Sequence, residues 1–218
     1  MIPPADHPAP LARPAARERP ATDARCAGCP QLGTFRALRR AGVAVQGGLG
    51  CDRDAERDLS PSTGQWAAVA GASELSRRGA QALVAEADRA GARLVVVADR
   101  LPADGGVRLE ALLAASGARV ERLDPADLAG TEAAVRRAAA QGTPTALLAL
   151  APCVRGAGRA PAVSIDPSRC NRCGACLGLA CPAISDPGGE ALAIDPLVCT
   201  GCGLCAPLCR TRAIGLGS

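Results

Sequence analysis

The sequence CNRCGACLGLACP, at residues 170–182, is followed by a second cysteine-rich stretch, CTGCGLCAPLC, at residues 199–209. Each stretch begins with three cysteines in the spacing C-x2-C-x2-C and reaches a fourth cysteine four or five positions later. Eight of the 12 cysteines in the chain therefore lie within one short segment. This segment decides how the C-terminal part of the protein folds.

The two runs have the spacing of a two-cluster ferredoxin. A [4Fe–4S] cluster needs four thiolates in tetrahedral directions, and a tight loop can supply three of them while the fourth comes from elsewhere. In such a pair the runs exchange their fourth cysteines. The pattern predicts a first cluster site (Cys170, Cys173, Cys176 and Cys209) and a second cluster site (Cys199, Cys202, Cys205 and Cys181). The alternatives are disulfides and structural zinc, and zinc does not call for two interlocked runs.

Residues 161–218 lack helical periodicity and are rich in glycine and proline. No apolar core of useful size is available there, so we expect something other than apolar burial to hold the segment together. The prediction is a small α+β ferredoxin-like domain with two [4Fe–4S] clusters. The first run has four residues before its last cysteine where the pattern has three, which a loop can absorb.

Residues 25–160 alternate between helix-like and strand-like segments. The apolar run RLVVVA, at 93–98, is typical of a buried parallel strand. Further strands are predicted at 43–46, 66–70, 118–123 and 145–150, and helices at 30–41, 73–90, 107–116 and 125–141. Repeated units of this length predict an α/β domain with a parallel, doubly wound sheet.

Four further cysteines lie in this upstream part. Cys26 and Cys29 precede the first predicted helix, Cys51 follows the first predicted strand, and Cys153 follows the last one. Because helix N-termini and strand C-termini share one edge of a parallel α/β sheet, the four thiols can converge there. The 12 cysteines then divide into three sets of four. This favours a third [4Fe–4S] cluster, with a four-cysteine zinc site or unligated thiols as alternatives.

Composition excludes several functions. The net charge of +4 over 218 residues leaves no basic stripe, so we expect no nucleic-acid partner. The apolar stretches are too short to span a bilayer, and residues 1–24 are predicted to be a disordered Pro/Ala/Arg-rich arm without an export signal. We expect a cytoplasmic protein with no membrane partner, where cysteines serve as ligands rather than disulfides.

The segment CAGCPQLGTFRALRRAGVAVQGGLGC, at residues 26–51, resembles the start of the thiamine-diphosphate domain of the 2-oxoacid:ferredoxin oxidoreductases. It is most similar to the large (alpha) subunit of the indolepyruvate ferredoxin oxidoreductase branch. The triplet APC at 151–153 and the two-cluster module match the same pattern, so the likeness covers residues 25–218. The resemblance implies a thiamine-diphosphate-binding-type fold, and it implies that Cys26, Cys29, Cys51 and Cys153 bind the cluster nearest thiamine.

The residues that bind thiamine diphosphate in that family are not matched. Its Gly-Asp motif aligns with Gly71-Ala72-Ser73, where Ala72 cannot ligate Mg²⁺, and its metal-binding Asn falls on Arg100. The family's upstream domains, including the one that supplies the activating glutamate, have no counterpart in the sequence. We therefore expect a truncated, degenerate thiamine-type domain at 25–160 that binds neither thiamine diphosphate nor Mg²⁺.

These observations predict an iron–sulfur electron-transfer protein or subunit without catalytic residues of its own. It would pass low-potential electrons between a partner oxidoreductase and a soluble carrier through up to three [4Fe–4S] clusters. A redox partner protein or an oxidoreductase subunit is the expected partner, in a homo- or hetero-oligomer. The alternatives are a catalytic 2-oxoacid ferredoxin oxidoreductase subunit that uses thiamine diphosphate, and a structural or sensing protein.

Overall fold

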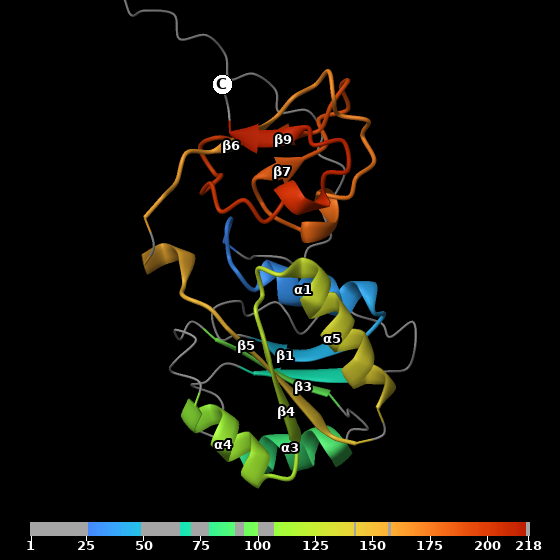
Figure 1. Ribbon diagram of the computed structural model, residues 1–218, viewed down its shortest axis with the longest axis vertical. Coiled ribbons are helices and arrows are strands. Elements are labelled where there is room, and N and C mark those ends of the chain that lie inside the picture. The colour runs from blue at the N-terminus through green and yellow to red at the C-terminus, as the bar shows by residue number, and fades with distance from the viewer. Residues whose placement is uncertain are drawn as a thin grey trace, which may run out of the picture.

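The computed structural model describes residues 26–48, 66–70, 79–89, 94–99, 107–141, 143–156 and 158–216. It contains an α/β unit, over residues 26–156, and a cysteine module, over residues 158–216, which lies beyond the helix labelled α1 in Figure 1. The predicted arm at 1–24 and Cys51 lie outside the described residues.

Five parallel strands form the sheet of the α/β unit. They are β1 (Ala44–Gly48), β2 (Trp66–Ala70), β3 (Leu94–Asp99), β4 (Arg119–Leu123) and β5 (Thr145–Leu150). Their order in the sheet is β1-β2-β3-β5-β4. Parallel pairing agrees with the predicted alternation of strands and helices, whereas a thiamine-diphosphate-type fold stays a prediction.

Helices cover both faces of this sheet. The helices α1 (Leu32–Arg40) and α5 (Leu128–Ala140) lie on one face, and α3 (Ala80–Arg89) and α4 (Val107–Ala115) lie on the other (Figure 1). Because the connection from β4 to β5 runs back across the sheet, a right-handed crossover places α5 on the face opposite α4.

Strand β5 shows why both faces must be covered. All six of its residues are buried. Ala146, Leu148 and Leu150 pack into the apolar cluster of α3 and α4. Leu147 and Ala149 pack into the cluster of α1 and α5. Since successive side chains of a strand point to opposite faces, an all-apolar strand is stable only between two layers.

Two helices begin later than the sequence predicted, because tight turns precede them. Leu32 N–H donates to the Cys29 carbonyl at 3.1 Å, so the residues before Leu32 form a turn rather than the start of α1. Helix α5 begins at Leu128 because the Asp127 carboxylate caps it, accepting from the Gly130 N–H at 3.0 Å. For the helix predicted at 73–90, the structure has α3 and leaves residues 71–78 outside its description.

A charged network joins α1 to α5. The Glu132 carboxylate accepts from Arg40 at 2.8 Å and from Arg36 and Arg136 at 3.1 Å. Burial raises the pKa of Glu132, but hydrogen bonds from Arg136 and Arg40 outweigh it, so that pKa lies below its usual value.

No helix in the described part of the chain is long and apolar enough to cross a membrane.

The cysteine module consists of two small antiparallel sheets and short 3₁₀ helices. Strand β6 (Val163–Ile165) pairs with β9 (Ile214–Leu216), and β7 (Ile184–Ser185) pairs with β8 (Ala193–Ile194). The 3₁₀ helix η3 (Leu177–Leu179) follows the first cysteine run and η4 (Ala206–Leu208) follows the second, while η2 (Val154–Gly156) precedes the module.

The two halves of the module repeat the same local hydrogen bonds. Cys170 N–H donates to the Asp166 carbonyl at 3.1 Å, and Cys199 N–H donates to the Asp195 carbonyl at 2.8 Å. Each aspartate side chain also accepts from the N–H two residues later, at 2.9 Å in both halves. The repeated Asp-Pro before each run therefore builds the same turn into both cysteine loops.

The module has an apolar core, contrary to the expectation from its sequence, and part of that core comes from the α/β unit. Leu32 of α1 and Leu128 of α5 are buried in one cluster with residues of the module. The module residues of this cluster are Val163, Cys176, Leu179, Ile184, Leu192, Leu204, Cys205 and Ile214. The module thus borrows its apolar surface from helices far away in the sequence, which composition alone does not reveal.

Candidate metal centre

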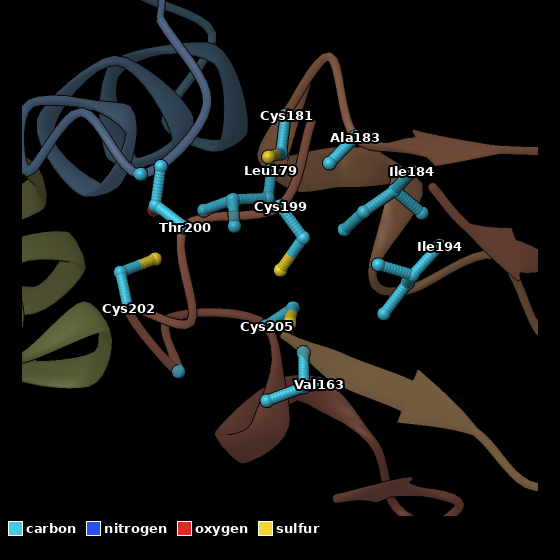
Figure 2. Close-up of a pocket in the computed structure, with 12 residues that line it drawn as sticks. Val163, Leu179, Cys181, Ala183, Ile184, Ile194, Cys199, Thr200, Cys202 and Cys205 are labelled. Carbon is cyan, nitrogen blue, oxygen red and sulfur yellow. The ribbon is translucent and has the colours of Figure 1, made fainter. Parts of the chain in front are cut away.

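The cysteines of the second cluster site line one cavity. Cys199, Cys202 and Cys205 come from the second run, and Cys181 comes from the segment after η3, which belongs to the first run. Figure 2 shows the four sulfur atoms around the same space, with Leu179, Ile184, Ile194 and Val163 beside them. The fold therefore brings a cysteine of one run to the three cysteines of the other.

Glycines allow the second run to bend around this cavity. Gly201 and Gly203 have φ values of +72° and +74°, in the left-handed region that side chains disfavour. The turn directs the Gly201 N–H to the Cys199 Sγ at 3.4 Å. Backbone N–H groups that point at sulfur stabilise negative charge on a thiolate and on any metal bound to it.

The thiols of this site affect one another electrostatically. Burial, together with the nearby Cys202, Cys181 and Cys199, raises the pKa of Cys205 to about 12. Burial also raises the pKa of Cys181, with Ala183 and Gly28 N–H groups acting in the opposite direction. Thiols held this close do not ionise readily together, and bound iron cations remove that penalty by coordinating the thiolates.

The first cluster site is supported by the packing of three of its cysteines against one apolar cluster. Cys176 is buried. Burial raises the pKa of its thiol, and the nearby Cys173 and Cys170 act in the same direction. Cys209 packs against the same apolar cluster as Cys170 and Cys176. Burial raises the pKa of Cys209, but the Thr211 hydroxyl and backbone N–H groups outweigh it, so the pKa lies below its usual value.

A buried hydroxyl at the second cluster site lacks a partner. Thr200 Oγ1 is buried and makes no hydrogen bond within the described residues, although Thr200 lines the cavity beside the cysteines. A buried hydroxyl without a partner is costly, and a sulfur atom of a bound cluster would be an acceptor for it. The donor set therefore fits an iron–sulfur cluster: four thiols, an N–H group directed at sulfur and a free hydroxyl.

A single metal ion and a cubane cluster make different demands on four thiols. In the described residues, no three His, Cys, Asp or Glu side chains are arranged to hold one metal ion. A single zinc ion draws its sulfurs to about 2.3 Å from one centre. A cubane instead places each of its four thiolates on a different iron, so the sulfurs stand farther apart.

Two parts of the upstream cysteine set lie together. The turn that contains Cys26 and Cys29 is tied to the end of β5, because the buried Gln31 side chain donates to the Ala149 carbonyl at 2.9 Å. A methyl group built on Gly28 would lie 3.1 Å from Val154 Cγ2, next to Cys153. The structure thus brings the Cys26–Cys29 turn beside the loop of Cys153.

Cys51 lies outside the described residues. The residues aligned with the thiamine motifs, Gly71–Ser73 and Arg100, are also outside the described part of the chain.

Sequence reasoning missed three residues that shape these sites: Gly28, Gln31 and Thr200. Gly28 lines the cavity of the second cluster site from the α/β unit, and Thr200 follows the first cysteine of the second run. A glycine inside C-x2-C is a signal for close backbone approach. Nothing in the sequence pairs Gln31 with Ala149, since 118 positions separate them.

One comparison with known proteins gives a match. Residues 192–215 match the family model described as a 4Fe-4S binding domain. The match includes β8, the whole second run and Cys209, so the chain carries an iron–sulfur segment of the 4Fe–4S-binding, ferredoxin-like kind. No curated protein and no solved structure matches the chain.

Proposed function

We propose that this protein is an electron-transfer protein or subunit that holds two [4Fe–4S] clusters in the cysteine module. Cys170, Cys173, Cys176 and Cys209 would bind one, and Cys199, Cys202, Cys205 and Cys181 the other. The observation that carries the proposal is the shared cavity of Cys181 with the three cysteines of the second run. A cluster of this kind takes up and releases one electron without bond making in the protein.

The chain's own residues would hold, insulate and expose these groups. Cys176 and Cys205 are buried, whereas Cys173 and Cys202 are exposed. Each site thus has one thiolate inside the apolar core and one at the surface. An electron can reach a partner protein through the exposed edge, while the buried side excludes water and lowers the local dielectric.

We propose further that Cys26, Cys29, Cys51 and Cys153 hold a third [4Fe–4S] cluster. Its support is the contact between the Cys26–Cys29 turn and the loop of Cys153, through Gly28 and Val154. The eleven cysteines in the described residues form no disulfides.

The resemblance to 2-oxoacid:ferredoxin oxidoreductases suggests the setting of this electron transfer. In our proposal, the protein has no catalytic site of its own and binds neither thiamine diphosphate nor Mg²⁺. A partner oxidoreductase or one of its subunits supplies the electrons, one at a time, and a soluble carrier takes them. The second candidate, a catalytic subunit that uses thiamine diphosphate, rests on the same resemblance.

A redox titration tests the proposal. The full chain, purified without oxygen, is reduced with dithionite while electron paramagnetic resonance follows each cluster. We expect reversible one-electron couples at low potential. A chain that shows no reversible couple is not an electron carrier. Calorimetry with Mg²⁺–thiamine diphosphate tests the second candidate, and we expect no heat of binding.

Paired cysteine variants test the exchange of fourth ligands. Cys181→Ala with Cys199→Ala disrupts a single site and should remove about four irons relative to the native chain. Cys181→Ala with Cys170→Ala disrupts both sites and should remove about eight. If the first pair removes eight irons and the second removes four, Cys181 belongs to the first run and our assignment is wrong.

A further inference from the structure

The turn that carries Cys26 and Cys29 forms part of the wall of the second cluster site. Gly28, in the middle of this turn, lines the same cavity as Cys181 and Cys202. The α/β unit therefore touches the space of the second cluster site itself as well as the apolar core around it. The contact joins a segment near the start of the described chain to one near its end.

Gly28 can occupy this place only because it has no side chain. Its φ is +75°, in the left-handed region. A Cβ atom there would lie 2.0 Å from Thr200 Oγ1 and 3.1 Å from both Thr200 Cβ and Val154 Cγ2. Any side chain at this position would push the turn away from the second cysteine run, because two of these neighbours are carbon atoms in a packed environment.

The close approach covers one side of the cavity. Thr200, against which Gly28 packs, also lines this cavity and holds the buried hydroxyl that lacks a partner in the described residues. The turn thus closes the site on the side of Thr200, and it keeps water from that side.

We propose that Gly28 is a positioning residue for the second cluster, through which the Cys26–Cys29 turn of the α/β unit packs against the second cysteine run and shields the cluster from water. This inference rests on the proposed function and deepens it. Reduction adds one negative charge at the site, and water stabilises that charge better than a packed apolar wall does. The packing of the α/β unit would then make the second cluster harder to reduce.

The test is Gly28→Ala in the full chain, with Gly188→Ala as the matched control. Gly188 is also left-handed, with φ +84°, but a methyl group there meets nothing within 4 Å. Dithionite supplies one electron to each cluster, and no bond in the protein forms or breaks. A redox titration followed by electron paramagnetic resonance measures the potential of each cluster. Cys181→Ala identifies the couple of the second site by its loss.

We expect Gly28→Ala to make the second site easier to reduce and to leave the couple of the first site unchanged. Entry of water on the opened side should raise the equilibrium constant for reduction about tenfold, or about 59 mV for one electron. Gly188→Ala should change no potential. If Gly28→Ala instead causes loss of the second cluster alone, the double variant Gly28→Ala, Thr200→Ala should bind the cluster again, because it removes the Thr200 Oγ1 atom that lies closest to the new methyl group.

Two results would overturn the inference. One is a Gly28→Ala protein with the same potentials and iron content as Gly188→Ala. The other is an equal shift, or an equal loss, at every couple, which would mark a general loss of structure. A native chain without reversible couples is a different result, because it removes the proposed function itself.

Discussion

Replacing Gly201 by alanine should show how closely the rest of the chain approaches the second cysteine loop. A Cβ atom at this position would lie 2.4 Å from the Pro161 carbonyl oxygen and 2.7 Å from the Ala160 carbonyl group. These neighbours are backbone atoms of residues 158–162, which lead into β6 and are called the linker here. Backbone atoms cannot rotate away as a side chain would. The linker or the cysteine loop must move.

The structure supplies a control two residues away. Gly203 has nearly the same conformation, with φ +74°, but a methyl group there meets nothing within 4 Å. Gly203→Ala should cost only the left-handed conformation, about 1–2 kcal/mol. Gly201→Ala should cost this and the overpacking as well, which adds about 1–3 kcal/mol. The difference between the variants therefore isolates the contact with the linker.

The assay is the rate at which the holo-protein loses its visible cluster absorbance in denaturant, without oxygen. A rate is appropriate because loss of a cluster is not a reversible two-state transition. If the linker contact breaks before the rate-limiting step, Gly201→Ala should lose absorbance roughly 5- to 100-fold faster than Gly203→Ala. Equal rates in the two variants would refute the argument that the linker lies against this loop.

Two further variants test the packing of α1, which carries the Cys26–Cys29 turn. Glu132→Gln should destabilise the protein by about 1–3 kcal/mol, because it leaves the Arg36 side chain, only 12% exposed, without its carboxylate partner. Because the pKa of Glu132 is lowered in the fold, its contribution is present above the usual value of 4.5 and disappears as the pH falls through the lower folded value. The rate of unfolding in denaturant should thus separate native and variant near neutral pH but not in acid, and a constant ratio of the two rates would contradict the assignment. Gln31→Leu should cost about 1–3 kcal/mol by leaving the Ala149 carbonyl without its donor, whereas Gln141→Leu, which loses one 3.4 Å contact, should cost less in the same assay.

The placement of most helices and strands follows from local patterns. Strand β3 is apolar from Leu94 to Ala98 and β5 is buried throughout, so periodicity and length suffice to find them. The first residues of α1 and α5 could not be predicted from the sequence, because the turn at Cys29 and the cap at Asp127 depend on hydrogen bonds that periodicity does not report. The boundary of a helix depends on single hydrogen bonds, whereas the presence of the helix depends on many residues.

The cysteine sites could likewise be predicted only in part from the sequence. The spacing of the second run indicates a cluster because one loop supplies three ligands in a fixed order. The contribution of Gly28 to that site comes from a contact between residues 28 and 200, which no local pattern encodes. The same holds for Leu32 and Leu128, which complete the apolar core of the cysteine module although they belong to helices of the α/β unit.

The metal content of the native chain tests the presence of three clusters most directly. The measurement is the number of irons, zincs and acid-labile sulfides per chain after purification without oxygen. Three clusters predict about twelve irons with a matching amount of sulfide and no zinc. Zinc in place of iron, or iron without sulfide, would contradict the claim that the cysteine module holds [4Fe–4S] clusters.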